Sequence, residues 1–294
     1  MCPKRVLAAT VLIPAVLVMA GPAAAWPFGG KKDAPAPAAA APATPAPAPA
    51  AAPQTAPVQV KATAAQRAEA RRYEPLAAAA FWGREVDLDP RDVEASVALS
   101  QSLRSLGRHR DAAETIQAAL IVDPNNLNAL LEISRAWIGM NQGFYAIEPA
   151  RKAASLAPRD WRPVGLLAVA YEQAQRDEEA LAAHRQAVAL APDEPGALSN
   201  YGMFLAARGD LPGAETVLRR ATASPRANAR VRQNLALVVG LQGRLPEAEA
   251  LARQDLPPEM VASNLAWLKA ALAKPGSTPA AGRSYQSVTG GGGR

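Results

Sequence analysis

Residues 158–192 read PRDWRPVGLLAVAYEQAQRDEEALAAHRQAVALAP, and most of the fold can be deduced from this stretch. It begins and ends on a proline, and prolines recur along the chain at one constant interval, as Pro90, Pro124, Pro158 and Pro192. Between two of these prolines, large apolar residues stand four apart, as Leu167 and Tyr171 do. That spacing places them on one face of a helix. Each interval therefore predicts two amphipathic helices, the second ending before the proline.

Small residues follow the same interval, which predicts where the helices approach closely. One such series consists of Ala78, Ala112, Ala146, Ala180, Ala214 and Ala248. Gly107, Gly209 and Gly243 are predicted to end first helices in the left-handed conformation. Pro212 and Pro246 then fall just inside the following helices, where a missing N–H costs little.

This pattern, with its interval of about 34 residues, resembles the tetratricopeptide repeat. Five units extend from Val93 to about Met260, preceded by a partial unit from Lys61 to Pro90 and followed by a capping helix from Glu259 to Ala273. The expected fold is all-α, a right-handed superhelical solenoid of helix pairs occupying residues 63–274. Terminal units are expected to be atypical, and Asp255 indeed replaces the small residue that earlier units carry at its position.

One stretch, Asn141 to Pro149, departs from the repeat pattern. Pro149 falls inside an expected second helix, where proline ordinarily costs about 3 kcal/mol. The helix is therefore expected either to bend there or to start late. Such a departure marks a place of structural or functional specialisation.

The chain outside residues 63–274 is expected to contain no repeats. Residues 1–25 have the pattern of a signal peptide, with Lys4 and Arg5 before an apolar run and small residues before Trp26. A retained anchor is the alternative, although the run is shorter than the ~20 residues that span a bilayer. Residues 26–62, rich in Ala and Pro, are expected to be a disordered linker. Residues 275–294, rich in Gly and Ser, are expected to be a disordered tail.

Composition narrows the function classes. The 294 residues carry a formal charge of +6, one cysteine (Cys2) and two histidines (His109 and His184). This excludes a disulfide framework and a Cys/His nucleophile pair, and it favours a non-enzymatic protein with no cofactor, metal or small-molecule substrate. The histidines are far apart in the sequence and no catalytic constellation of carboxylates accompanies them, so structural or surface roles are expected rather than catalysis. Arginines are scattered without interleaved aromatic residues, which argues against nucleic-acid binding.

First helices of such repeats line the inner wall of the solenoid, so their polar residues that packing does not require are candidates for holding a peptide. These candidates are Gln101, Arg104, Glu132, Arg135, Arg162, Glu172, Asn200, Met203, Arg230, Gln233 and Asn234.

Several alternatives stay open within this set. Asn200 and Asn234 share one repeat position and are either rungs of an amide ladder for a peptide backbone or simply solvated residues. Arg162 and Arg230 are expected at the second position of their helices, where they either bind a carboxylate or remain exposed helix ends. Large aromatic residues of the first helices, such as Trp137, are expected to pack in the core.

Three stretches carry a closer resemblance: residues 157–163 (APRDWRP), 169–173 (VAYEQ) and 230–244 (RVRQNLALVVGLQGR), together with the irregular stretch at 141–149. They resemble the TadD family of tight-adherence (Flp) pilus assembly proteins over most of residues 76–272. The resemblance implies a scaffold that assists assembly of the outer-membrane secretin and the pilus. It also implies an exported, periplasmic location associated with the outer membrane.

The chain departs from that family's lipoproteins because Cys2 precedes the apolar run instead of following it. A lipid anchor is therefore not implied for this chain. The Ala/Pro linker is expected to tether a loosely held or soluble periplasmic protein, and membrane association through partners stays open. Two functions remain open: a pilus-assembly scaffold that binds a secretin or another pilus component, and a general periplasmic adaptor for envelope enzymes or complexes.

Overall fold

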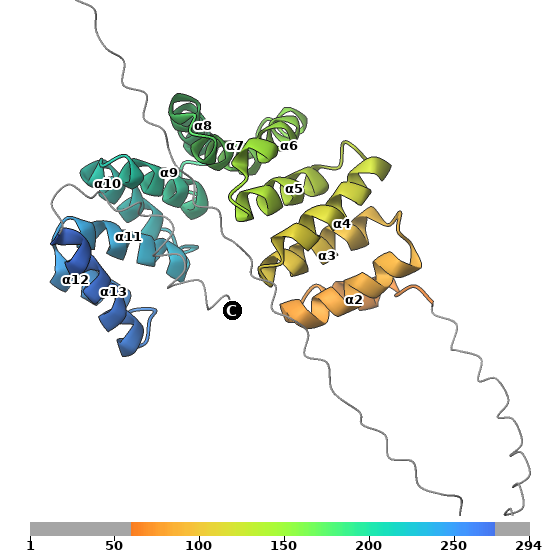
Figure 1. Ribbon diagram of the computed structural model, residues 1–294, viewed down its shortest axis with the longest axis horizontal. Coiled ribbons are helices and arrows are strands. Elements are labelled where there is room, and N and C mark those ends of the chain that lie inside the picture. Colours follow the sequence, from red (N-terminus) through yellow and green to blue (C-terminus); the bar gives the residue numbers. More distant parts are fainter. Residues whose placement is uncertain (1–59, 274–294) are drawn as a thin grey trace, which may run out of the picture. The chain divides into compact units, whose positions relative to one another are not determined.

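The computed structural model describes residues 60–273, and all regular secondary structure there is α-helical (Figure 1). The described helices are α1 (Ala64–Ala70), α2 (Pro75–Leu88), α3 (Val93–Ser105), α4 (His109–Val122), α5 (Leu127–Gly139), α6 (Gly143–Leu156), α7 (Trp161–Gln173), α8 (Asp177–Leu190), α9 (Pro195–Ala207), α10 (Leu211–Thr222), α11 (Ala229–Leu241), α12 (Leu245–Ala252) and α13 (Pro258–Leu272). Helices α3 to α12 form the five expected pairs. The expected signal peptide and tail, and most of the expected linker, lie outside the described residues.

The first helix of each pair starts in the same way. A residue with a carboxylate or amide side chain precedes it and accepts a hydrogen bond from a backbone N–H of the first turn. These caps recur at the interval of the repeat as Asp92, Asn126, Asp160, Glu194 and Asn228. Second helices α2, α4, α6 and α8 end two residues before the four prolines of the repeat, as expected.

The turn between the two helices of a pair also repeats. Gly107, Gly209 and Gly243 have φ of +75°, +85° and +83°, which confirms the predicted left-handed caps. The two remaining pairs place Asn141 and Gln175 at the same position, with φ of +57° and +60°. Backbone geometry at this turn is therefore shared by all five pairs, although only three of them use glycine.

Close approach between helices occurs at the predicted small residues. Ala112, Ala146, Ala180 and Ala214 have no exposed surface. Ser100 Oγ of α3 donates to the carbonyl oxygen of Ala112 in α4 at 3.0 Å. Larger side chains at these positions would push the helices apart.

Helix α6 contains Pro149 and runs without a break from Gly143 to Leu156. It begins at the same repeat position as α4, α8, α10 and α12, so the expectation of a late start is wrong. Proline has no N–H, so the carbonyl oxygen of Tyr145 lacks its usual helical donor.

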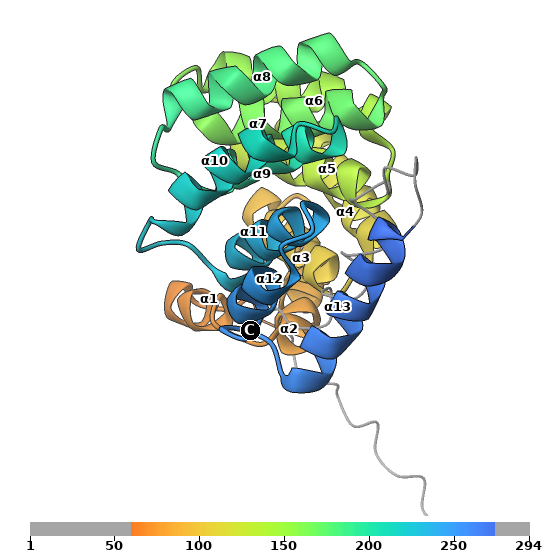
Figure 2. The same ribbon diagram turned by 90° about the vertical axis from the view of Figure 1, so that its left-hand side faces the viewer.

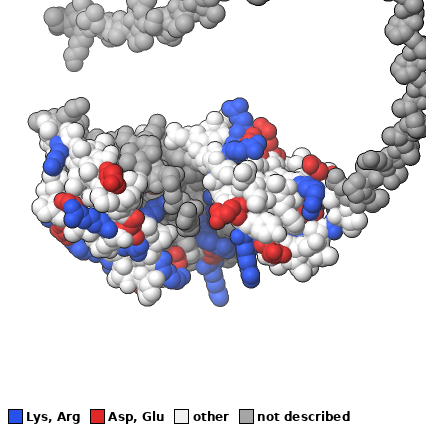
Figure 3. Space-filling model, turned by 90° about the horizontal axis from the view of Figure 1, so that it is seen from below, with Lys and Arg blue, Asp and Glu red and all other residues white. Residues whose placement is uncertain are grey.

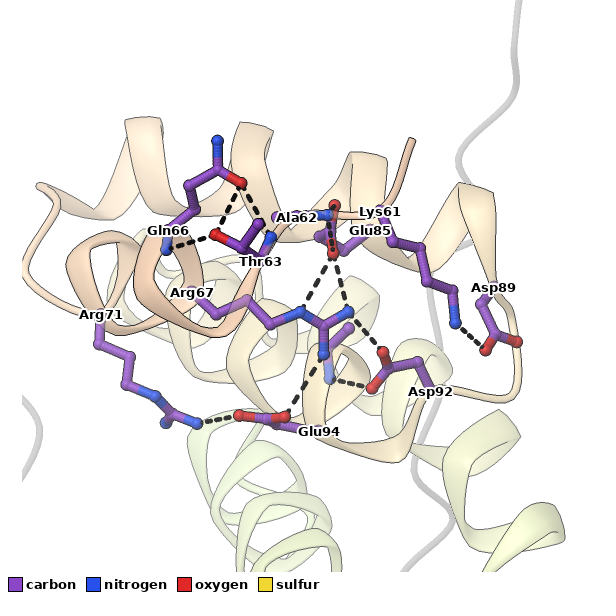
Figure 4. Close-up of polar contacts among 11 residues, drawn as sticks. Lys61, Ala62, Thr63, Gln66, Arg67, Arg71, Glu85, Asp89, Asp92 and Glu94 are labelled. Carbon is purple, nitrogen blue, oxygen red and sulfur yellow. Dashed lines mark hydrogen bonds and ion pairs between the residues drawn. The ribbon is translucent and has the colours of Figure 1, made fainter. Parts of the chain in front are cut away.

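A polar network attaches α1 to the first full pair (Figure 4). Arg67 contacts the buried carboxylate of Glu85 and that of Asp92, each at 2.7 Å, and the backbone N–H of Ala62 also donates to Glu85. Burial raises the pKa of Asp92, but hydrogen bonds from Arg67 and from the Ala95 amide outweigh it, so the pKa is lowered. The hydrogen bond to Asp92 raises the pKa of Arg67. Ala70 is the only buried residue of α1, so apolar packing contributes little there. The ion pairs and hydrogen bonds of the network therefore hold α1 in place.

Helix α13 packs against α11 and α12 at the end of the row of helices (Figure 2). Val261 and Leu268 are buried there. The helix begins at Pro258 and thus one residue before the expected start, and it covers apolar surface of the last pair as a capping helix does.

Candidate functional site

The contacts between helices show which face the first helices line. Within residues 60–273, each first helix contacts the first helix of the next pair, from α3 to α5 and onward to α11 and α13. Second helices of successive pairs have no such direct contacts in this part of the chain. Because one set of helices is drawn together and the other spread apart, the first helices form the inner wall of the solenoid.

Three of the predicted side chains are exposed on this wall without a side-chain partner among the described residues. They are Gln101 on α3, Asn200 on α9 and Arg230 on α11. Arg230 is the second residue of its helix, as predicted. Amide and guanidinium groups of this kind can donate to carbonyl oxygens of an extended peptide, and the amides can also accept from its N–H groups.

Glu132 does not belong to the accessible surface. Only 1% of it is exposed, and its carboxylate lies between Arg104, whose Nε is 3.0 Å away, and Arg135, one turn further along α5. Burying a carboxylate is costly unless charged donors compensate it. The cluster therefore joins α3 to α5, and the expectation that Glu132 meets a partner is contradicted by its burial. The two arginines remain partly exposed on the wall.

Gln233 is the second exception, because it is 4% exposed. Its Nε2 donates to Asp255 Oδ2 at 3.3 Å and to the carbonyl oxygen of Ala252 at 3.4 Å. Gln233 therefore connects α11 to the end of α12. The repeat position alone could not reveal this, since the acid that attracts it is specific to the last pair.

Glu172 has a partner that the sequence did not suggest. Its Oε1 lies 2.5 Å from Nε2 of His184, which is 1% exposed. The imidazole lies against Phe204 and Tyr201, with ring centroids 5.0 and 6.0 Å apart. The sequence contains no sign of this carboxylate partner, and the buried imidazole lies between helices, where a structural role is expected. The pair holds α7, α8 and α9 together and leaves Glu172 partly exposed.

The remaining arginine, Arg162, is the second residue of α7 as predicted. It bonds the cap residue Asp160, with Nη2 and Oδ2 2.6 Å apart. This hydrogen bond lowers the pKa of Asp160 and raises that of Arg162. The guanidinium of Arg162 is half exposed, but it is already hydrogen-bonded to the carboxylate of Asp160. It is therefore less available to a partner than that of Arg230.

The two asparagines have different surroundings. Asn200 is exposed, whereas Asn234 is partly buried and its Nδ2 donates to Ser199 Oγ at 2.9 Å. Only Asn200 retains its whole amide for a ligand. Met203 is partly buried and packs with the last core cluster.

Aromatic residues of the first helices follow the prediction. Tyr171 is buried, and Trp137 and Tyr201 pack against the same cluster. Asn128 is a further candidate of the inner wall that the sequence did not single out. It is exposed at the second position of α5, which is the repeat position of Arg162 and Arg230, and that shared position could have identified it.

The surface carries charges of both signs. On the face in Figure 3, basic and acidic side chains lie intermingled. In residues 60–273, no group of three or more His, Cys, Asp or Glu side chains could hold a metal ion. None of the helices described is long and apolar enough to cross a bilayer.

Comparison with known proteins agrees with this geometry. A family model described as tetratricopeptide repeat matches residues 164–198, which cover most of α7 and α8. A thermophilic tetratricopeptide-repeat protein of Thermus thermophilus superposes with a TM-score of 0.55 at 23% identity, covering 60% of this chain and 99% of its own. The fold is a tetratricopeptide-repeat solenoid.

Two further solved structures are similar to this tetratricopeptide-repeat solenoid. A tetratricopeptide-repeat protein from Parabacteroides merdae has a TM-score of 0.59 at 12% identity, covering 69% of this chain and 80% of its own. MamA from Desulfovibrio magneticus has a TM-score of 0.47 at 23% identity, covering 55% of this chain and 92% of its own. The search of curated proteins gave no match. At 12% identity the likeness to the Parabacteroides merdae protein concerns the fold alone.

Proposed function

We propose that this protein is a non-enzymatic scaffold that holds an extended segment of a partner protein along its first helices. One observation carries the proposal: Gln101, Asn200 and Arg230 are exposed on the inner wall, spread from α3 to α11, and make no side-chain bond within the described residues. Side chains spread in this way suit a long peptide better than a compact substrate. Tetratricopeptide repeats in general bind protein partners.

The more specific proposal is that the partner belongs to the tight-adherence pilus apparatus, as the outer-membrane secretin or a component that assembles with it. Its support is the resemblance at residues 157–163, 169–173 and 230–244. In this proposal the chain is exported and works in the periplasm, with any attachment to the outer membrane made through its partners.

The test is capture of the secretin from outer-membrane extracts of the source cells by the immobilised full chain. Asn200→Ala combined with Arg230→Ala removes two exposed side chains and leaves the caps and ion pairs in place. Each lost hydrogen bond is worth roughly 0.5–1.5 kcal/mol, so affinity should fall by about fivefold to over a hundredfold.

The matched control is Gln117→Ala with Arg185→Ala, two exposed residues of second helices. It should capture the secretin as the unchanged protein does. Loss of capture in both double variants, or in neither, would refute the inner wall as the binding site. Capture of other envelope proteins in place of the secretin would favour a general periplasmic adaptor.

A further inference from the structure

Two arginines on the inner wall share a single carboxylate. Arg104 of α3 and Arg135 of α5 both bond to Glu132, and we call these two residues the arginine pair. The side chain of Glu132 is 1% exposed, whereas those of Arg104 and Arg135 are 32% and 28% exposed. The acid therefore lies beneath the two guanidinium groups, and the surface of the wall carries an excess of one positive charge at this place.

The guanidinium groups of the arginine pair retain unused donors. Arg104 donates to Glu132 through Nε and Arg135 donates through Nη1, and neither has another hydrogen bond or ion pair within residues 60–273. Their nitrogens are not among the buried atoms that lack a partner in that range, so the unused N–H groups reach solvent. A carboxylate is the acceptor that can bond two N–H groups of one guanidinium at once.

The nearest acids on either side of the arginine pair already have partners of their own. Glu94 lies at the other end of α3, about 15 Å from Arg104 along the helix axis, and it bonds to Arg71. That separation exceeds the Debye length of about 8 Å at physiological ionic strength. On the other side, Asp160 at the start of α7 is hydrogen-bonded to Arg162. The positive excess at the arginine pair therefore persists.

The arginine pair is specific to the first two pairs of helices. The repeat position of Arg104 is occupied in the later pairs by Ile138, Glu172, Ala206 and Gly240. The repeat position of Arg135 is occupied in the other pairs by Gln101, Val169, Met203 and Leu237. Among the described repeats, only α3 and α5 therefore bring two arginines together at these positions.

Exposed amides lie on the same two helices as the arginine pair. Gln101 is one turn before Arg104 on α3, and Asn128 is two turns before Arg135 on α5. Neither amide has a side-chain hydrogen bond within residues 60–273. Amides can both donate to and accept from the main chain of an extended segment, which leaves the charged donors of the arginine pair for one of its side chains.

We propose that the arginine pair binds an aspartate or glutamate side chain of the extended partner segment. This inference rests on the proposed function, in which the first helices hold such a segment, and it adds the chemistry of that segment at α3 and α5. The carboxylate of the partner replaces water at the unused N–H groups of Arg104 and Arg135. A lysine at the same place in the segment would meet a like charge.

The probe is a rhodamine-labelled peptide of glycine, serine and three aspartates with an amidated C-terminus, and its binding to the full chain is measured by fluorescence anisotropy. Arg104→Gln with Arg135→Gln should weaken its binding by about tenfold or more, because charge-assisted hydrogen bonds are lost. A peptide with asparagines in place of the aspartates should bind the unchanged protein more weakly, also by about tenfold. Equal binding of the two peptides would overturn the proposal.

Glu132→Gln separates a binding role of the arginines from a structural one. It should strengthen binding of the aspartate peptide by about threefold or more, because it removes the buried negative charge that opposes the carboxylate of the ligand. The glutamine oxygen still accepts a hydrogen bond from an arginine. If the arginines only joined α3 to α5, this variant and the arginine double variant would change binding in the same direction. Reduced or unchanged binding in Glu132→Gln would therefore contradict the proposal.

The matched control is Arg110→Gln with Arg185→Gln, two exposed arginines of second helices without an ion pair or hydrogen bond within residues 60–273. It removes the same charge and should leave binding of the aspartate peptide unchanged. An equal loss of binding in this control would show that the peptide responds to net charge alone, and would overturn the proposal.

A triple variant guards against unfolding, because the arginine double variant leaves Glu132 buried without a charged partner. Adding Glu132→Gln to Arg104→Gln and Arg135→Gln removes all three charges. The triple variant should match the unchanged protein in circular dichroism and bind the aspartate peptide about tenfold more weakly. Binding as tight as that of the unchanged protein would refute the arginine pair as the site.

Secretin capture distinguishes this inference from the proposed function on which it rests. If Asn200→Ala with Arg230→Ala abolishes capture while the aspartate peptide does not bind, the inner wall stays the binding site and the acidic residue is refuted. If the aspartate peptide responds to the variants as expected but the secretin is not captured, the acidic site stands and the secretin is not its partner.

Discussion

At the scale of single residues, the last pair shows how one repeat position can change its chemistry. Asp255 occupies the position that four earlier pairs fill with alanine, and Arg232 occupies the position of Leu130, Val164 and Leu198. The earlier residues pack together in apolar clusters, as Leu130 does with Ala153. In the last pair an ion pair replaces them, with Arg232 Nε 2.9 Å from Asp255 Oδ2. The hydrogen bond from Arg232 lowers the pKa of Asp255.

We expect Asp255→Ala alone to lower the free energy of unfolding by about 1–2 kcal/mol, because it leaves Arg232 without its carboxylate. Arg232→Leu with Asp255→Ala should recover that loss, since it restores the apolar pair of the other repeats. Urea denaturation of the three proteins measures this. Equal destabilisation by the single and the double variant would show that the two positions do not interact.

Left-handed turn positions give a second test at this scale. Gln175 has φ of +60° without being glycine, and Gly209 has φ of +85° with no atom near its missing side chain. Gln175→Gly should therefore stabilise the protein by about 0.5–1 kcal/mol, and Gly209→Ala should destabilise it by about 1 kcal/mol. Thermal unfolding of both variants beside the unchanged protein measures the direction of each change in stability. Shifts in the same direction would show that backbone strain does not dominate at this turn.

At the scale of helices, close approach and capping determine the arrangement. Small residues lie where helices meet, and side-chain caps define where first helices start. Second helices are less regular: α6 tolerates Pro149, and α12 is only eight residues long. The candidate side chains of the inner wall belong to the regular set of first helices.

Ala180→Leu and Ala214→Leu should each destabilise the protein by about 1–3 kcal/mol, because both alanines are fully buried between helices. Hydrogen exchange should show reduced protection in the neighbouring pairs too, since each repeat is stabilised mainly by its neighbours. The matched control is Ala182→Leu on the exposed side of α8, which should change stability little. Unchanged stability in both core variants would mean that the helices can separate at no cost.

At the scale of the described residues as a whole, ion pairs occur along the length of the array, both between elements, as in Arg67 with Asp92, and within one, as in Arg162 with its cap Asp160. Asp92, Asp160 and Asp255 all have a lowered pKa. A carboxyl group with a lowered pKa in the folded state stabilises it above the unfolded value, about 4, and loses that contribution as the pH falls through the folded value.

The free energy of unfolding should therefore fall steeply below about pH 4, measured by urea denaturation at a series of pH values. The variant Arg232→Leu with Asp255→Ala should show a shallower fall, because one of these groups is gone. An identical pH profile for the two proteins would show that Asp255 contributes nothing to acid sensitivity.

The repeat could be deduced from the amino-acid sequence, because a constant period in prolines and small residues reflects local constraints of helix ends and close packing. Left-handed turns at the three glycines and the core positions of the aromatic residues followed from the same rules. The partners that Glu132, Gln233 and His184 find outside their own helices could not be deduced in this way, since those contacts depend on how the helices pack against one another. Likewise, only the tertiary structure shows a groove of about 480 Å³ beside Leu76, where α2 and α4 both pack against α3 without direct contact with each other.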